Sequence, residues 1–378
     1  MHLYLHIPFC KQACHYCDFH FSTNLSQKSA LVDAICTEIA LQKDYLPTKT
    51  LETIYLGGGT PSLLTASELG QLFETIHRYF SVASTAEITL EANPDDLTVD
   101  KLDQLRLFVN RLSIGIQTFD DETLRWMNRA HSAVEAERCI QLARDAGFET
   151  MSVDLIYGIP DQKEQRRQGG IWQTDLQKML SLDVAHLSAY ALTIEPDTAF
   201  GRWQQKGKLA ALDENLAAEQ FEELTKALAG AGYEHYEISN FAKPGQYARH
   251  NTAYWQRKAY LGVGPSAHSY NGVSRQYTVA NNAQYISAIR RGEVPATLEM
   301  LSVSDQVNDY LLTGLRTKWG CSLRELSVLL SADFAKTQAN DLQAMYEAGW
   351  LMQDGDYLRL TEAGKLFADR VAASLFVD

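Results

Sequence analysis

The amino-acid sequence predicts an α/β protein, a partial (β/α)6 barrel followed by a C-terminal, mainly helical, winged-helix-like domain. Short apolar or β-branched runs alternate with longer segments of helical period along the first half of the chain. Six such units are too few for a complete eight-unit barrel, which needs roughly 250 residues. Near the C-terminus, helical segments precede a two-strand ribbon, Trp350–Gln353 and Tyr357–Leu360, around a turn-forming Asp-Gly-Asp.

Strands separated by helix-length segments indicate repeated βα units around a parallel sheet. The predicted strands are His2–Ile7, Thr53–Leu56, Glu87–Glu91, Arg111–Ile116, Ser152–Tyr157 and His186–Leu192. The predicted helices include Lys28–Gln42, Ala66–Tyr79, Val134–Ala146 and Gln162–Leu180. We expect three regions: the barrel over 1–230, an extension of the barrel over 231–295 and the winged-helix-like domain over 296–378.

Composition and charge exclude several classes of protein. The 378 residues carry 47 acidic and 34 basic side chains, a net charge of −13, whereas a nucleic-acid-coating protein would be basic. Apolar runs stay short of the roughly 18–20 residues of a membrane span, and Met1–Phe9 lacks the basic start of a signal peptide. We therefore expect a cytoplasmic protein without a membrane span.

The predicted winged-helix-like domain is itself acidic. Residues 300–378 hold 7 Lys and Arg against 11 Asp and Glu, a net charge of −4. Contact with phosphates needs a basic face. This domain is therefore predicted to be a lid or docking domain, with no nucleic acid as partner.

The six cysteines divide into an isolated set and a cluster. The isolated thiols lie in or beside apolar segments, where free cysteine commonly acts as a small buried hydrophobe: Cys36, Cys139 and Cys321. The clustered thiols form C-x3-C-x2-C directly after the first predicted strand: Cys10, Cys14 and Cys17. In a reducing compartment such a cluster indicates metal binding or redox chemistry.

Two metal centres fit this cluster. A Cys3His zinc site would need His15 or His20, because structural zinc takes four ligands and no second Cys or His pair lies nearby at the usual spacing. An iron–sulfur cluster normally takes four thiolates. Three thiolates would leave one iron without a protein ligand and open to a small molecule.

The C-x3-C-x2-C spacing, with Tyr16 before the last cysteine, resembles the signature of the radical S-adenosylmethionine (SAM) superfamily. The resemblance implies a [4Fe–4S] cluster on Cys10, Cys14 and Cys17, with SAM bound to the fourth iron. It also implies a partial (β/α)6 barrel, in agreement with the strand count. A reduced cluster of this type can cleave SAM to a 5′-deoxyadenosyl radical.

Polar residues follow four further predicted strands, at the barrel face that carries chemistry in such folds. They are the Gly57–Pro61 turn, Glu91 with Asn93-Pro94, Gln117, and Asp154 before a Gly-Ile-Pro turn. The family resemblance implies that the SAM contacts lie here and in two neighbouring segments: Tyr4, Tyr16, Gly58, Gly59, Thr60, Glu91, Gln117, Arg129 and Asp154. Carboxylates can bond ribose hydroxyls, and Arg129 can pair with the SAM carboxylate.

Within the superfamily, the chain resembles the group formed by oxygen-independent coproporphyrinogen III dehydrogenase (HemN) and the HemW haem chaperones. The dehydrogenase continues to a fourth cysteine where this chain has Phe19, and it carries a long extension where this chain has nine residues before Cys10. The segment Ala248–Trp255, ARHNTAYW, contains the H-N-x-x-Y-W signature of HemW. All three features favour the chaperone family.

The resemblance implies a haem site at His250, Asn251, Tyr254 and Trp255. An imidazole is a common axial ligand of haem iron, and the two aromatic rings could contact a porphyrin face. Arg249 could pair with a propionate, and His268 is a second candidate ligand. An ordinary structural role for His250 and Trp255 stays open at this point.

The sequence therefore predicts a haem chaperone that binds [4Fe–4S], SAM and haem. Its implied partners are haem, acceptor haemoproteins, which include transiently contacted membrane haemoproteins, and a reducing electron donor such as flavodoxin or ferredoxin. The alternative is an oxygen-independent coproporphyrinogen III oxidase, an enzyme of porphyrin metabolism that decarboxylates propionates through the deoxyadenosyl radical. Whether the chain cleaves SAM is left open.

Overall fold

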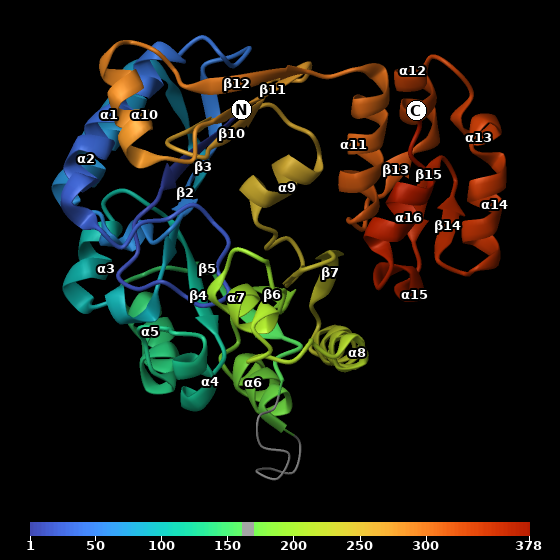
Figure 1. Ribbon diagram of the computed structural model, residues 1–378, viewed down its shortest axis with the longest axis horizontal. Helices are drawn as coiled ribbons and strands as arrows, with labels where there is room; N and C mark the ends of the chain where they lie inside the picture. Colours follow the sequence, from blue (N-terminus) through green and yellow to red (C-terminus); the bar gives the residue numbers. More distant parts are fainter. Residues whose placement is uncertain (161–169) are drawn as a thin grey trace.

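The computed structural model describes residues 1–160 and 170–378, and it confirms the predicted fold class. Six parallel strands form the wall of an open barrel (Figure 1). They are β1 (His2–Ile7), β2 (Thr50–Gly58), β3 (Ser81–Ala92), β4 (Arg111–Gln117), β5 (Thr150–Tyr157) and β6 (His186–Ala191). All six were predicted, and β1 has the predicted bounds.

The sheet continues beyond both ends of this wall, which the sequence did not predict. Its order is β12-β11-β10-β9-β1-β2-β3-β4-β5-β6-β8-β7. β9 is parallel to β1, whereas the remaining added strands pair antiparallel. The added strands are β7 (Glu234–Glu237), β8 (Asn240–Ala242), β9 (Tyr260–Val263), β10 (His268–Tyr270), β11 (Ser274–Thr278) and β12 (Ala296–Met300).

Helices cover the outer face of the sheet, with α1, α2 and α10 together at one end (Figure 1). Thr65 and Glu68 form a reciprocal capping box at the start of α2, which has the predicted bounds. Residues 162–169 of the predicted helix Gln162–Leu180 lie outside the described part of the chain. The helices are α1 (Lys28–Leu41), α2 (Ala66–Tyr79), α3 (Val99–Leu105), α4 (Asp121–Trp126), α5 (Ala133–Asp145), α6 (Gly170–Ser181), α7 (Ala199–Gln205), α8 (Glu214–Gly230), α9 (Arg249–Trp255) and α10 (Asn282–Arg290).

The C-terminal region has its own apolar core, separate from that of the barrel. Its three-stranded sheet has the order β13-β15-β14, and Figure 1 shows it beside the barrel. Arg316 joins the two parts by donating to buried Glu237 over 3.0 Å. The elements are α11 (Val303–Leu315), β13 (Cys321–Ser322), α12 (Leu323–Leu330), α13 (Phe334–Thr337), α14 (Ala339–Glu347), β14 (Leu351–Asp354), β15 (Tyr357–Leu360), α15 (Glu362–Lys365) and α16 (Ala368–Ser374). The three domain boundaries given above stay a prediction.

The barrel is apolar outside its wall and polar inside it. In β1, Leu3, Leu5 and Ile7 are fully buried in the main apolar core, whereas the alternate side chains are His2, Tyr4 and His6. Since successive side chains of a strand point to opposite faces, the alternate set faces the barrel interior. No helix among the described residues has the length and apolarity needed to cross a membrane.

Glu38 on α1 fixes the outer helices to the edge of the sheet. Its side chain is fully buried and accepts hydrogen bonds from the Tyr285 hydroxyl at 2.5 Å, the Gly264 amide at 2.7 Å and the Gln42 amide at 2.7 Å. Burial raises the pKa of Glu38 from its ordinary 4.5 to about 7. The folded chain therefore binds more protons here than the unfolded chain at pH values between these two.

We expect Glu38 to make the protein less stable as pH rises from about 4.5 to 7. The folded-state pKa lies above the unfolded one, so the contribution of Glu38 to stability is fully present below 4.5 and is lost as pH rises through the folded pKa, up to about 3 kcal/mol. Thermal unfolding of the metal-free chain at pH 5 and pH 8 should show a smaller loss in Glu38→Gln than in the unaltered chain. Equal losses would contradict this account.

Candidate cluster, SAM and haem sites

The three clustered cysteines lie on one loop that leaves the carboxyl end of β1. The loop is closed by the Cys10 amide, which donates to the Ser22 carbonyl at 3.1 Å, and by a turn between Cys17 and Cys14 at 3.3 Å. All three thiols are free and half-buried. The sequence pattern therefore becomes a compact loop whose thiols share one end of the barrel.

The glycine turn after β2 holds this loop from one side. The amides of Gly59 and Thr60 donate to the carbonyls of Ile7 and Phe9 at 3.0 and 2.7 Å. A Cβ on Gly59 would lie 2.7 Å from the Phe9 nitrogen and 2.8 Å from two backbone oxygens, so only glycine fits. The Thr60 hydroxyl also lies 3.5 Å from the Cys10 sulfur.

The segment after α4 holds the loop from the other side. The His15 amide donates to the Met127 carbonyl at 3.0 Å, and the His15 ring lies 2.7 Å from the Trp126 carbonyl. The Gln12 amide donates to both the backbone and the side-chain oxygen of Asn128 at 2.9 Å. Contacts on both sides thus position the loop that carries the thiols.

The geometry does not favour the zinc alternative. The His15 ring contacts a backbone carbonyl, and the His20 ring lies 2.8 Å from the Asn282 side chain. Over residues 1–160 and 170–378, no three His, Cys, Asp or Glu side chains converge closely enough to hold one metal ion. The ligands of an iron–sulfur cluster bind different irons, so they do not need to converge on one point.

Arg129 places a positive charge beside the cysteine loop. Its guanidinium donates to the Gly115 carbonyl at 2.6 Å and the Asn93 side chain at 2.7 Å, and it lies 3.4 Å from the Cys14 sulfur and 3.5 Å from the Tyr16 hydroxyl. The Arg129 Nε is buried without a hydrogen-bond partner among the described residues. A cation with a spare donor beside the thiols suits thiolate ligands and a carboxylate-bearing ligand.

Two half-buried carboxyl groups, those of Glu91 and Asp154, lie beside this loop, inside the barrel. Glu91 accepts from the Tyr55 hydroxyl at 2.8 Å and from the Gly58 amide at 3.1 Å. Burial, and next the nearby Asp154, raise the pKa of Glu91 to about 7, and burial raises that of Asp154 to about 6. A ligand that supplies hydroxyl donors or a positive charge would stabilise the ionised form of these two carboxyl groups.

The remaining predicted SAM contacts also lie at this end of the wall. The Tyr4 hydroxyl lies 3.1 Å from the His6 ring, in the barrel interior. Gln117 has a left-handed backbone with φ of 72°, where the pairing of β4 with β5 shifts register between Gly115 and Gln117. The nine predicted SAM residues therefore belong to strands and loops that meet around the cysteine loop.

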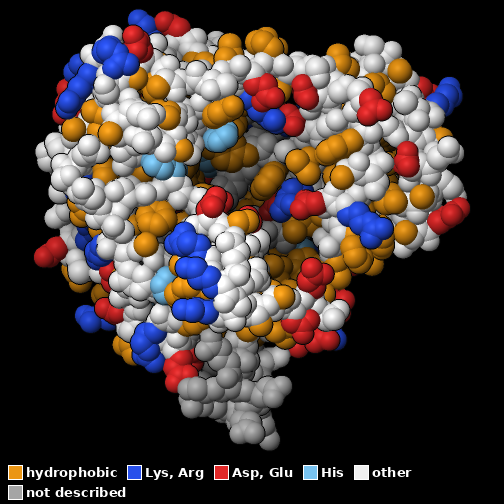
Figure 2. All heavy atoms as spheres, viewed as in Figure 1, with side chains coloured by type: hydrophobic (Ala, Val, Ile, Leu, Met, Phe, Trp, Pro, Cys, Tyr) orange, Lys and Arg blue, Asp and Glu red, His pale blue; other side chains and the backbone are white. Residues whose placement is uncertain are grey.

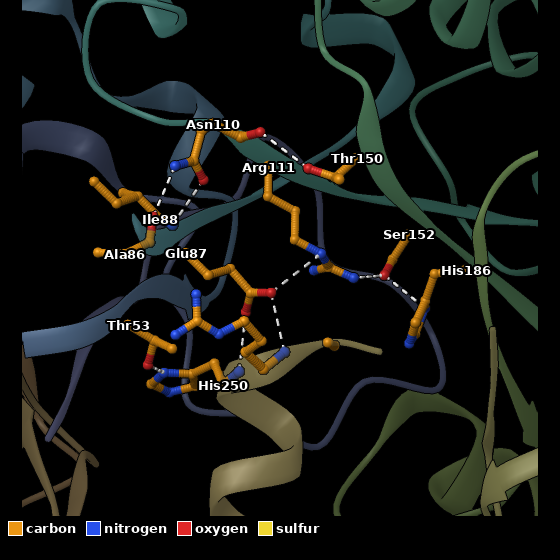
Figure 3. Close-up of polar contacts among 12 residues, drawn as sticks. Thr53, Ala86, Glu87, Ile88, Asn110, Arg111, Thr150, Ser152, His186 and His250 are labelled. Atoms are coloured by element: carbon orange, nitrogen blue, oxygen red, sulfur yellow. Dashed lines mark hydrogen bonds and ion pairs between the residues drawn. The ribbon is translucent and has the colours of Figure 1, made fainter. Parts of the chain in front are cut away.

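His250, one of the two candidate iron ligands, is buried in the barrel interior, with 1% of its surface exposed. Its Nδ1 lies 2.6 Å from the Thr53 hydroxyl, and its Nε2 lies 2.8 Å from the Tyr254 hydroxyl. Figure 3 draws the contact between His250 and Thr53. Burial lowers the pKa of His250 well below its usual value. The ring is therefore neutral, and both its nitrogens are engaged.

Glu87 clamps the first turn of α9 onto the barrel wall (Figure 3). Its carboxylate accepts from the backbone amides of Arg249 at 3.0 Å and His250 at 2.9 Å. Arg111 lies 3.9 Å from Glu87 and also donates to Ser152, which lies 2.7 Å from the His186 ring. The sequence did not predict this network, although Glu87 and Arg111 at the starts of two predicted strands were a visible signal.

The other predicted haem residues lie on or near α9 and are more accessible. Asn251 and Trp255 are half-buried, and Arg316 lies 5.3 Å above the Trp255 ring. His268 is exposed and stacks on Tyr277 at 5.6 Å. Hydrophobic, acidic and histidine side chains surround a hollow on this face of the molecule, near the place of α9 in Figure 1 (Figure 2).

Comparisons with known proteins agree with these observations. A family model of the radical SAM superfamily matches residues 4–169, and one of the HemN C-terminal domain matches 301–367. The haem chaperone HemW of Bacillus subtilis is 35% identical to the chain, with 97% of each covered. The chain belongs to the HemW family. HemW of Escherichia coli is 32% identical over 97% of this chain and 95% of its own length.

A solved structure shows the fold that accompanies this HemW sequence. Coproporphyrinogen III oxidase (HemN) of Escherichia coli, described as a radical SAM enzyme, superposes with a TM-score of 0.85. The match covers 99% of this chain and 89% of that one at 23% identity. The likeness establishes the shared fold. Phe19, two residues after the third clustered cysteine, is 72% exposed.

We predict that Gly59→Ala lowers the iron and sulfide content of the chain after anaerobic reconstitution. The added Cβ would meet backbone atoms that cannot move aside, a strain of about 1–3 kcal/mol that displaces the cysteine loop. Gly70→Ala is the matched control, because its Cβ on α2 would meet its nearest atom at 3.9 Å. Equal iron content in both variants would show that the turn does not position the loop.

Proposed function

We propose that this HemW family member is a haem chaperone that binds a [4Fe–4S] cluster, SAM and one haem, and passes the haem to acceptor haemoproteins. The observation that carries the proposal is the similarity to HemW haem chaperones over nearly the whole chain. The contacts of the cysteine loop and of α9 support it. Haem and haemoproteins are the proposed partners.

Cys10, Cys14 and Cys17 are the proposed cluster ligands, held by the glycine turn and the segment after α4. A reduced cluster of this kind supplies an electron that can cleave bound SAM. Arg129 would orient the SAM carboxylate, and Glu91 and Asp154 would accept its ribose hydroxyls. The proposed SAM residues are Tyr4, Tyr16, Gly58, Gly59, Thr60, Glu91, Gln117, Arg129 and Asp154.

The proposed haem residues are His250, Asn251, Tyr254 and Trp255. A neutral imidazole is the form that can ligate iron, and burial keeps His250 neutral. One of its ring nitrogens must first leave its hydroxyl partner. The half-buried Trp255 and the hollow near α9 offer a place for the flat apolar face of a porphyrin (Figure 2).

The proposal also covers the cellular location of the protein, its partners and its division into regions. We propose a cytoplasmic location, a reducing donor such as flavodoxin or ferredoxin, and transient contact with membrane haemoproteins. We also propose that the chain divides into regions 1–230, 231–295 and 296–378, with the acidic C-terminal region as a lid or docking domain. Nucleic acid is not among the proposed partners.

Haemin added to the purified protein should produce a Soret band that saturates at one haem per chain. His250→Ala should weaken haem binding about ten-fold or more, because the axial ligand is lost. His77→Ala, on the exposed face of α2, is the matched control and should bind like the unaltered chain. Unchanged affinity in His250→Ala would remove this residue from the ligand set.

The alternative function is oxidative decarboxylation of coproporphyrinogen III. The set of candidate SAM residues around the cysteine loop favours retention of radical chemistry, and so keeps this alternative open. Anaerobic incubation of the cluster-loaded protein with reductant, SAM and coproporphyrinogen III separates the two functions. We expect no protoporphyrinogen IX, whereas its formation would contradict a chaperone-only role.

A further inference from the structure

Tyr55 on β2 connects the proposed haem residue His250 to the proposed SAM residue Glu91. Its ring stacks on the His250 imidazole, with 5.0 Å between the ring centroids and 27° between the planes. Its hydroxyl donates to Glu91 at 2.8 Å, and the other oxygen of Glu91 accepts from the Gly58 amide at 3.1 Å. One side chain therefore touches groups of both sites.

The position of His250 in this structure is incompatible with iron ligation. An imidazole binds iron through a free ring nitrogen, but both nitrogens of His250 contact hydroxyl groups, those of Thr53 and Tyr254. Only 1% of the side chain is exposed, so a porphyrin cannot approach it. Haem binding through His250 must change its position, and with it the stack on Tyr55.

We infer that Tyr55 is a positioning residue that couples the two sites, so that SAM weakens haem binding and haem weakens SAM binding. This inference rests on the proposed function. A SAM molecule that bonds Glu91 fixes the carboxylate that holds the Tyr55 hydroxyl. A fixed Tyr55 keeps its ring against His250 and opposes the movement that haem requires.

The charge on Glu91 supports the direction of this coupling. Burial raises the pKa of Glu91 to about 7, so protonated and ionised forms coexist near neutral pH. The sulfonium charge of SAM favours the ionised form, which can only accept hydrogen bonds and therefore requires the Tyr55 hydroxyl to donate. By thermodynamic linkage, each ligand lowers the affinity of the other by the same factor. SAM would then act as a signal for haem release.

Haemin titrations of the cluster-loaded chain, followed at the Soret band without reductant, test the coupling because SAM stays intact. We expect saturating SAM to raise the haem Kd of the unaltered chain about five-fold or more. Tyr55→Phe keeps the ring but loses the bond to Glu91, so its haem Kd should be nearly the same with and without SAM. Tyr157→Phe, whose ring packs on Trp172 and Phe221, should behave like the unaltered chain.

The reciprocal measurement, SAM binding by equilibrium dialysis with and without haemin, should show the same factor in the unaltered chain. It tests the inference without any variant. Equal haem affinity with and without SAM in the unaltered chain, or undiminished coupling in Tyr55→Phe, would overturn the role of Tyr55. Absence of a Soret band in every variant would instead overturn the proposed function.

Discussion

The structure depends on the burial of polar side chains inside an open barrel. A buried polar group without a hydrogen-bond partner costs free energy, so each inward-facing side chain needs a partner across the interior. The hydrogen bonds of Glu87 to α9 and the contacts of Arg111 with Glu87 and Ser152 meet this need (Figure 3). The helix that carries the proposed haem residues is therefore part of the interior.

Strand periodicity explains why the two proposed sites are neighbours. On β2 the alternate residues Thr53, Tyr55 and Gly57 face the same side. Thr53 and Tyr55 contact the ring of His250, and Gly57 begins the glycine turn that contacts the start of the cysteine loop. On β3 the same spacing separates Glu87, which holds α9, from Glu91 beside the turn. Two strands thus contact the haem residues nearer their middles and the proposed SAM residues at their carboxyl ends.

Local patterns in the sequence predicted the elements that they encode directly. The apolar run His2–Ile7 and the helical period of Ala66–Tyr79 predicted bounds that the structure confirms. Strands such as β8, Asn240–Ala242, were missed because three residues carry too little pattern and form only by pairing with distant strands. The C-x3-C-x2-C spacing indicated the cysteine loop.

A local sequence pattern could not predict the burial of His250. Its motif lies on a seven-residue helix, and its partner Thr53 is 197 residues away, so the ring contact depends on the completed barrel. The role of Tyr55 was hidden for the same reason, because its neighbours come from β3 and α9. The sign of these buried contacts in the sequence was a set of charged and histidine residues at alternate positions of the predicted strands.

The position of the His250 ring in the haem-loaded protein tests the central claim most directly. A crystal structure with haem bound should show the His250 imidazole on the iron and no longer within hydrogen-bond distance of the Tyr254 hydroxyl. If His250 still contacts both Thr53 and Tyr254 while haem is bound elsewhere, the account of α9 as a haem-binding element released from the barrel interior is wrong.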